Sequence, residues 1–147
     1  MEASPLDANE SEWGCLGSLI DNANSSEIGA GLLNSVSITN YHDKLNNYYT
    51  NPSICNPANN GSVVSRESLL YNINNTKDWF LPSENELSLL YKNLKTEDLS
   101  TFKNTNYWSS TQMDENNAIC IDFSNGNVIS HSKVNSNNCQ VRFIRYF

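Results

Sequence analysis

The strongest local signal in the chain is the stretch Asp78-Trp79-Phe80-Leu81-Pro82-Ser83-Glu84-Asn85-Glu86-Leu87. Pro82 and Ser83 end an extended segment, and Ser83 with Glu86 forms a capping-box pattern. The apolar residues that follow at helical spacing are Leu87, Leu90, Tyr91 and Leu94. They give the segment one hydrophobic face. The sequence therefore predicts a helix from about residue 84 to residue 94.

After Thr101 the hydrophobic pattern changes to a period of two, which is typical of strands. The residues expected to point inward are Ile119, Ile121 and Phe123, and those expected to point outward are Cys120 and Asp122. Ser124-Asn125-Gly126 favours a hairpin turn, so residues 127–133 are predicted to form the return strand. Val141 to Phe147 alternates again and predicts a final strand.

The N-terminal half gives shorter signals. Residues 1–11 are polar and are expected to form a loose arm. Residues 12–20 mix apolar residues with glycines and predict one or two short strands. Residues 32–45 predict a short helix, and residues 67–73 predict a brief helix or an ordered turn. The segment between them, residues 46–62, is rich in Asn, Pro and Ser and predicts a long surface loop.

Composition agrees with a loop-rich globular chain. A length of 147 residues suits one domain, which we place at residues 12–147 after the arm. About one residue in six is Asn, which favours turns and caps. The aromatic fraction of 10% argues against disorder. These features predict an α+β fold with short helices and a small antiparallel sheet.

The charge limits the partners. A net charge of −7 argues against nucleic acid and against an anionic membrane surface. There is no run of about 18 apolar residues, so no membrane insertion by this chain is expected. The start of the chain lacks the apolar stretch of a secretory signal. Either the protein is made without one or, as we favour, the chain is a segment of a longer protein.

The four cysteines are Cys15, Cys55, Cys120 and Cys139. None of them forms a C-x-x-C pair, so no structural zinc site is expected. Two disulfides are possible in three pairings. A Cys120–Cys139 bond would join neighbouring C-terminal strands, and the alternative is that these residues are small buried or half-exposed thiols.

The sequence shows no catalytic pattern. It has no Gly-rich phosphate loop, and its two histidines, His42 and His131, have no adjacent carboxylate pattern of a metal site. Glu84 and Glu86 are close enough in sequence for acid–base chemistry. In the first turn of a helix, however, acidic residues usually complement the helix dipole. We therefore expect that the chain is not an enzyme and that it binds neither a cofactor nor a metal ion.

Together these motifs resemble the DUF1566 family, also called the Lcl C-terminal domain family, which has a C-type-lectin-like fold. The signature residues are "DWFLPS..EL" at 78–87, "YWSS" at 107–110 and "VR..R.F" at 141–147, with Trp13-Gly14-Cys15 and Ile28-Gly29-Ala30-Gly31 before them. The resemblance runs from about Glu12 to the end. It implies a core of Trp79, Phe80, Trp108, Ile121, Phe123 and Val141. Arg142 and Arg145 are expected to stabilise loops by hydrogen bonding carbonyls.

Some members of this family resemble the variable proteins of diversity-generating retroelements. In those systems adenine changes convert Asn codons into codons for many other residues, among them Cys, Asp, Ile, Ser, His and Val. An AT-rich genome would also enrich Asn. The candidate ligand-binding residues are Gln112, Met113, Cys120, Asp122, Asn127, Ile129, Ser130, His131, Ser132, Val134 and Gln140.

The predicted hairpin suits a binding role for these positions. Ile129 and Val134 interrupt its polar face, and exposed apolar residues beside Ser130, His131 and Ser132 are typical of a recognition patch. A register shift of one residue would instead place Ile129 in the core. The chain lacks the Glu-Pro-Asn or Gln-Pro-Asp triplet of calcium-dependent sugar-binding lectins. A lectin-like fold here therefore implies neither sugar nor calcium.

The sequence thus favours a non-catalytic domain that displays a variable C-terminal surface to a protein or other macromolecular ligand. The alternative is a fixed adhesin module that binds host or matrix polysaccharide or protein. Either would act at the cell surface or outside the cell as part of a longer protein, or on a virus. The oligomeric state is not predicted.

Overall fold

The structure, a computed structural model, describes residues 1–99 and 101–147 and has the α+β composition predicted from the sequence. The helices are α1 (Gly31–Lys44), α2 (Val64–Leu70) and α3 (Glu84–Leu90). The strands are β1 (Glu2–Ala3), β2 (Asn106–Gln112), β3 (Asn117–Asp122), β4 (Asn127–Ser132), β5 (Cys139–Gln140) and β6 (Ile144–Arg145). Single turns occur at η1 (Pro52–Ile54), η2 (Tyr91–Lys95) and η3 (Ser136–Asn138).

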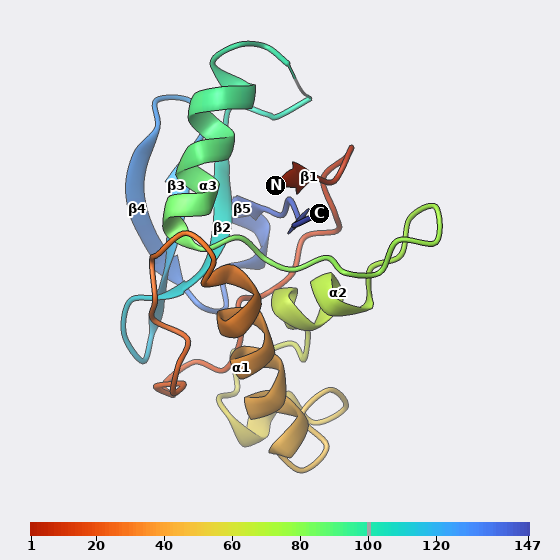
Figure 1. The fold of residues 1–147 in the computed structure, drawn as a ribbon. Coiled ribbons are helices and arrows are strands. Elements are labelled where there is room, and N and C mark those ends of the chain that lie inside the picture. Colours follow the sequence, from red (N-terminus) through yellow and green to blue (C-terminus); the bar gives the residue numbers. More distant parts are fainter. Residues whose placement is uncertain (100) are drawn as a thin grey trace.

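The larger sheet has the strand order β4-β3-β2-β5, with β4 at one edge (Figure 1). β3 is antiparallel to both of its neighbours, but β5 runs parallel to β2. The sheet is therefore mixed rather than antiparallel as predicted. The reason is that β4 already runs in the direction of β2, and residues 133–138 return the chain to the start of β2, where Cys139 pairs with Asn106.

Both faces of this sheet are covered, so it separates two hydrophobic clusters. Trp108 and Cys120 belong to the cluster that also contains residues of α1 and α2, whereas Tyr107 and Ile121 belong to the cluster beneath α3. The expectation that Cys120 points outward is wrong, because the face opposite Ile121 is packed as well. The six aromatic and aliphatic residues predicted as core are all buried.

α3 begins as predicted. The Ser83 hydroxyl accepts a hydrogen bond from the Glu86 amide at 3.4 Å, and the Glu86 carboxylate accepts one from the Ser83 amide at 2.8 Å. The α-helix ends at Leu90 and continues as the π-helical turn η2 to Lys95. The predicted apolar face up to Leu94 thus spans two kinds of helix.

The N-terminal half is helical where predicted, with α1 and α2 close to the expected ranges. The loop at residues 46–62 contains one short turn, η1. Residues 12–20 form no strand, contrary to expectation. Buried side chains order this region instead. The Glu12 carboxylate accepts hydrogen bonds from the Asn60 amide and from the Asn59 side chain, each at 3.0 Å.

The N-terminal arm is attached to the domain, contrary to the expected loose arm. β1 pairs with β6, and the Ser4 amide donates to the Phe143 carbonyl at 2.8 Å. The two chain ends consequently lie side by side (Figure 1). Of the predicted final strand at residues 141–147, only Ile144 and Arg145 form a named strand, because β1 offers just two residues for pairing.

Arg142 joins this arm to the core. Its buried guanidinium donates to the Ser4 carbonyl at 3.0 Å and lies 2.6 Å from the Asp7 carboxylate. This confirms that Arg142 stabilises a loop through a carbonyl. Arg145 instead pairs with the carboxylates of Glu2 at 2.7 Å and Asp78 at 3.6 Å.

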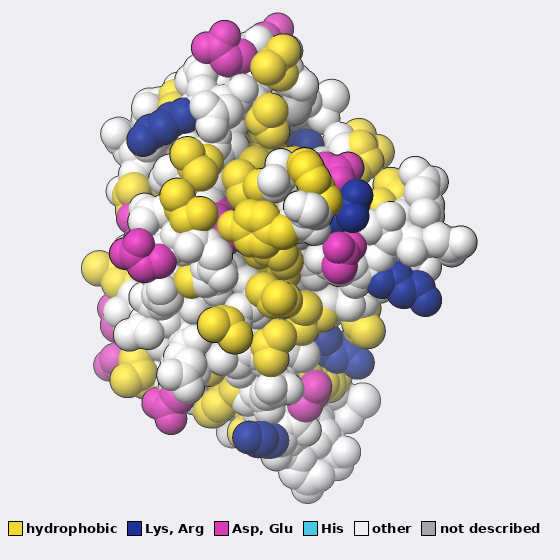
Figure 2. Space-filling model, in the orientation of Figure 1, with side chains coloured by type: hydrophobic (Ala, Val, Ile, Leu, Met, Phe, Trp, Pro, Cys, Tyr) yellow, Lys and Arg dark blue, Asp and Glu magenta, His cyan; other side chains and the backbone are white. Residues whose placement is uncertain are grey.

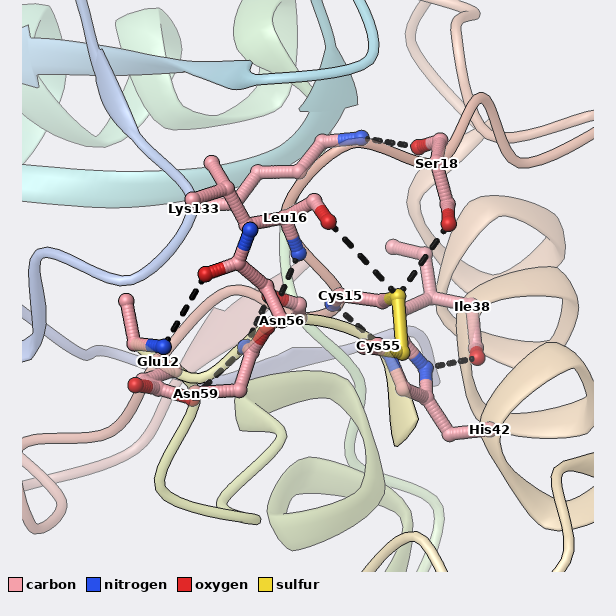
Figure 3. The surroundings of a disulfide bond; sticks show 12 residues. Glu12, Cys15, Leu16, Ser18, Ile38, His42, Cys55, Asn56, Asn59 and Lys133 are labelled. Atoms are coloured by element: carbon pink, nitrogen blue, oxygen red, sulfur yellow. Dashed lines mark hydrogen bonds between the residues drawn. A yellow bond between two sulfur atoms is a disulfide. The ribbon is translucent and has the colours of Figure 1, made fainter. Parts of the chain in front are cut away.

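The disulfide joins Cys15 to Cys55 and not Cys120 to Cys139 (Figure 3). Cys120 and Cys139 are buried free thiols with their sulfur atoms 3.0 Å apart. Next to the disulfide, His42 Nε2 accepts a hydrogen bond from the Cys15 amide at 2.9 Å, and burial lowers the pKa of His42 to about 4. None of the helices described is long and apolar enough to cross a bilayer.

Candidate ligand-binding surface

The β3–β4 hairpin is built on an ordered turn. Asp122 Oδ1 accepts hydrogen bonds from the amide of Ser124 at 2.8 Å and from its hydroxyl at 2.6 Å. Asn125 donates to the other carboxylate oxygen at 2.8 Å. Gly126 completes the turn with a φ of 81°, as the Asn-Gly pair predicted. These bonds, with Ser124 as the main donor, lower the pKa of Asp122.

β4 is the exposed strand of this hairpin. Asn127, Val128 and Ser130 are exposed, and the remaining β4 residues are half-buried. Ile129 is half-buried against the core, so the alternative that it belongs to the core is correct in part. β3, in contrast, has Ala118, Cys120 and Ile121 buried. The structure thus places a solvent-facing strand beside a packed one.

His131 is the centre of a small polar cluster on β4. Its ring nitrogens lie 3.0 Å from the Asn106 amide nitrogen and 3.1 Å from that of Asn135. The ring also contacts Trp108 edge-on, with ring centroids 6.4 Å apart. A neutral imidazole has one donor and one acceptor, so one of the two amides must present its oxygen to the ring. The cluster offers polar groups suited to contacting a ligand.

Three other predicted residues are accessible but lie outside β4. Met113 is exposed in the connection between β2 and β3. Val134 and Gln140 are half-buried. The Gln140 side chain accepts a hydrogen bond from Lys103 at 2.8 Å and donates one to Glu10 at 2.8 Å. Gln140 therefore lies in a network at the end of the sheet.

Two of the predicted residues are too buried to contact a ligand. Cys120 on β3 is fully buried in the cluster that contains Trp108, as described above. Gln112 is also buried, and its side chain bonds both main-chain groups of Ile20, at 2.9 and 3.1 Å. It accepts a further bond from Lys133 at 2.7 Å. Gln112 therefore fixes the N-terminal segment to the sheet.

Lys133, just after β4, is buried as well. Its ammonium donates to the Ser18 carbonyl at 2.7 Å and lies 4.9 Å from the Trp13 ring centre (Figure 3 labels Ser18 and Lys133). Burial lowers its pKa to about 8. Lys133 thus ends the exposed strand by turning a charged side chain into the molecule.

Sequence reasoning missed two residues of this surface. Val128 is half exposed on β4, and the period-two pattern alone did not distinguish it from a core residue. Asn106 contacts His131 from β2. No local pattern indicated this contact, because Asn106 and His131 are 25 residues apart in the sequence.

The molecule has other accessible features away from the hairpin. A cavity of about 410 Å³ lies between α1 and residues 19–22, and one of about 610 Å³ lies beside Tyr71 and Phe143. Figure 2 shows hydrophobic side chains gathered along the middle of one face. The exposed hydrophobic residues of α1 and the segment before it are Ile28, Leu32, Leu33 and Val36. Within the described residues, no group of His, Cys, Asp and Glu side chains is placed to bind a metal ion.

The chain matches a known protein family. The sequence profile of the Lcl C-terminal domain matches residues 43–145, which include α2, α3 and the whole larger sheet. No curated protein matches the chain.

Proposed function

This chain belongs to the Lcl C-terminal domain family, and we propose that it is a non-catalytic ligand-binding domain with a C-type-lectin-like fold. The β3–β4 hairpin would display its binding surface. The observation that supports the proposal most strongly is the contrast between the two strands. β4 exposes Asn127, Val128 and Ser130, while β3 anchors it through a packed core.

This arrangement suits a surface whose residues vary. A change at an exposed β4 position removes no core packing, and the rigid frame lowers the entropic cost of ordering the displayed side chains. Ile129, Ser130, His131 and Ser132, adjacent on β4, could each be reached from an Asn codon by changing adenines only. We therefore favour a variable protein of a diversity-generating retroelement, with a protein or other macromolecule as ligand.

The disulfide supports an extracellular place of action. Cys15–Cys55 links segments 40 residues apart, and such bonds persist in oxidising compartments. We propose that the domain acts at the cell surface, outside the cell or on a virus, as part of a longer protein.

The contacts of the buried ionisable side chains favour a binding function over a catalytic one. The buried side chains of Glu12, His42, Lys133 and Arg142 each bond main-chain groups of loops or strands. Their roles are accounted for by structure. A general acid or base would instead be free to contact a substrate.

The test is to sequence this gene across many isolates over the codons for residues 107–147. The proposal expects substitutions at the adenines of Asn-type codons for Asn127, Ser130 and Ser132, with Trp108 and Gly126 constant. Substitutions spread evenly over core and surface codons would contradict it. A uniformly conserved segment would reject the variable surface and leave the fixed adhesin module as the remaining hypothesis.

A further inference from the structure

β4 forms an open edge of the larger sheet. It is the last strand in the order β4-β3-β2-β5, and in the described chain only β3 pairs with it. All six β4 residues pair with β3 in continuous register, without a bulge. Figure 1 shows β4 at the outer edge of the molecule. In the described chain, the main-chain groups that point away from β3 are therefore available to another strand up to Ser130, whereas the Ser132 carbonyl already accepts a hydrogen bond from the Asn135 amide at 2.9 Å.

This edge lacks the usual protection against pairing. Exposed edges in natural proteins commonly carry charged residues, proline or a bulge. Residues 127–132 read Asn-Val-Ile-Ser-His-Ser and contain no proline and none of Asp, Glu, Lys or Arg. The next residue, Lys133, is buried and does not guard the edge. The strand thus presents an uncharged, regular backbone about 20 Å long.

Negative charge flanks both ends of this uncharged strand. Asp122 lies at the hairpin end, opposite Asn127. Asp114 and Glu115 lie at the other end, because the neighbouring Asn117 pairs with Ser132. Hydrogen bonds from Ser124 and Asn117 lower the pKa of Asp122 and Asp114 respectively, so both carboxylates are charged at neutral pH.

We propose that the ligand is an extended polypeptide segment that adds to the sheet alongside β4. Its main-chain amides and carbonyls would form hydrogen bonds with the open edge of β4. Only an extended polypeptide, and no other class of macromolecule, can pair with the edge in this way. Its middle would be uncharged to match residues 127–132, and basic residues at its ends would face Asp122 and Asp114. This inference rests on the proposed function, because it names the ligand class of the same surface.

Strand addition also explains how one surface can serve varied ligands. Main-chain pairing contributes affinity whatever the side chains are, and alternate side chains then select the sequence. Val128 and Ser130 alternate with Ile129 and His131, so they face opposite sides of the sheet. Substitutions on β4 thus change which peptide binds and leave the mode of docking unchanged.

The test uses the full chain, immobilised, and a pool of capped hexapeptides. Each peptide has Lys at both ends and Val, Ile, Thr or Tyr at the four middle positions. A matched pool carries N-methyl groups on the middle amides, which removes strand pairing but keeps the side chains. Retained peptides are quantified by mass spectrometry. We expect at least tenfold higher retention of the unmethylated pool, and lower retention when Glu replaces the terminal Lys.

Two edge variants and one control locate the binding. Ser130→Lys and Val128→Lys place a charge on the exposed strand without touching the core, and each should reduce retention at least tenfold. Asn46→Lys adds the same charge in the remote loop at residues 46–62 and should leave retention unchanged. Circular dichroism and melting confirm that all three variants fold.

Three outcomes would overturn strand addition: no retention by the unmodified chain, equal retention of both pools, or full retention by both edge variants. These outcomes are separable from failure of the proposed function. If isolates vary at β4 codons but no pool is retained, the variable surface stands and strand addition falls. If the gene is uniform among isolates but the unmethylated pool is retained, strand addition is supported and the proposal of a variable surface is rejected.

Discussion

Single polar side chains do much of the ordering that regular secondary structure does in other folds. Glu12 positions the loop at Asn59 and Asn60, and Gln112 fixes the main chain of Ile20. Such bonds satisfy buried main-chain groups where no helix or strand is present. They explain how a chain so rich in Asn folds with long irregular segments.

His42 makes the stability of the folded state depend on pH. Burial, the main cause, lowers its pKa from 6.5 to about 4, so the folded state keeps the ring neutral while the unfolded state takes up a proton. Because the unfolded state binds more protons, stability falls as pH decreases from 6.5 towards 4. The linked loss is about 3 kcal/mol. Urea unfolding followed by Trp fluorescence across this pH range measures it.

The control for this prediction is His42→Gln, which keeps a donor and an acceptor but does not titrate. Glu12 and Glu67 have pKa values raised by burial, so they act in the opposite direction in both proteins. The difference between the two pH profiles therefore isolates His42. Parallel profiles would show that His42 is not the cause.

Gly126 is required by the hairpin for two reasons. Its φ is 81°, and an added Cβ would meet the ring of Tyr91. Gly29 has a φ of 95° but open space around the Cβ position, so it is a matched control. We expect Gly29→Ala to cost about 1 kcal/mol from backbone strain, and Gly126→Ala to cost about 1–3 kcal/mol more from the clash. Equal unfolding free energies in urea would refute the clash.

At the scale of elements, β2 and β4 have opposite roles. β2 lies inside the sheet and has six of its seven residues buried, whereas β4 has none fully buried. Strand position therefore separates the frame from the displayed surface. The central strand β2 contributes side chains to two hydrophobic clusters, while the edge strand β4 has one hydrogen-bonding edge without a neighbouring strand in the described chain.

This division predicts unequal effects of truncation. Trp108→Ala on β2 should destabilise the fold by about 3–5 kcal/mol, because it leaves a large cavity in the core. Ser130→Ala on β4 should change stability by less than about 0.5 kcal/mol, since the side chain is exposed. Thermal melts of both variants provide the measurement. Similar losses in the two would contradict the separation of frame and surface.

At the scale of the whole molecule, the two chain ends are joined by a buried ion pair. Asp7 from the arm accepts from Arg142, whose side chain is 1% exposed. Breaking such a pair leaves an uncompensated charge, so Asp7→Asn should cost about 3–5 kcal/mol. Glu2→Gln breaks the exposed pair with Arg145 and should cost no more than about 1 kcal/mol. Chemical denaturation compares them, and equal costs would show that the arm does not depend on Asp7.

The Cys15–Cys55 disulfide connects the N-terminal segment to the long loop across 40 residues. Chain entropy predicts that it stabilises the fold by about 4 kcal/mol. Reductant should therefore lower the melting temperature of the natural chain and leave a Cys15→Ser/Cys55→Ser variant unchanged. Cys120 and Cys139 should react with an alkylating reagent only after denaturation, because both are buried. Rapid alkylation of the folded protein would contradict their burial.

Local patterns predicted most of the elements near the candidate surface. The capping box at Ser83 and Glu86, the apolar spacing of α3 and the Asn125-Gly126 turn all involve residues within a few positions of one another. The aromatic core residues were also predicted, because their burial follows from their size. The candidate surface was found in part: the exposed Asn127 and Ser130 were included and the exposed Val128 was missed, while the buried Gln112 and Cys120 were included.

By itself, the sequence determined the α+β class, the start of α3, the hairpin and the identity of the main core residues, because short-range spacing encodes them. Only the tertiary structure decided that the arm pairs with β6, that β5 runs parallel to β2 and that Cys15 bonds Cys55. It also decided that both faces of β3 are covered. Each of these depends on contacts between segments far apart in the chain, and a period-two pattern cannot show whether one face of a strand or both are covered.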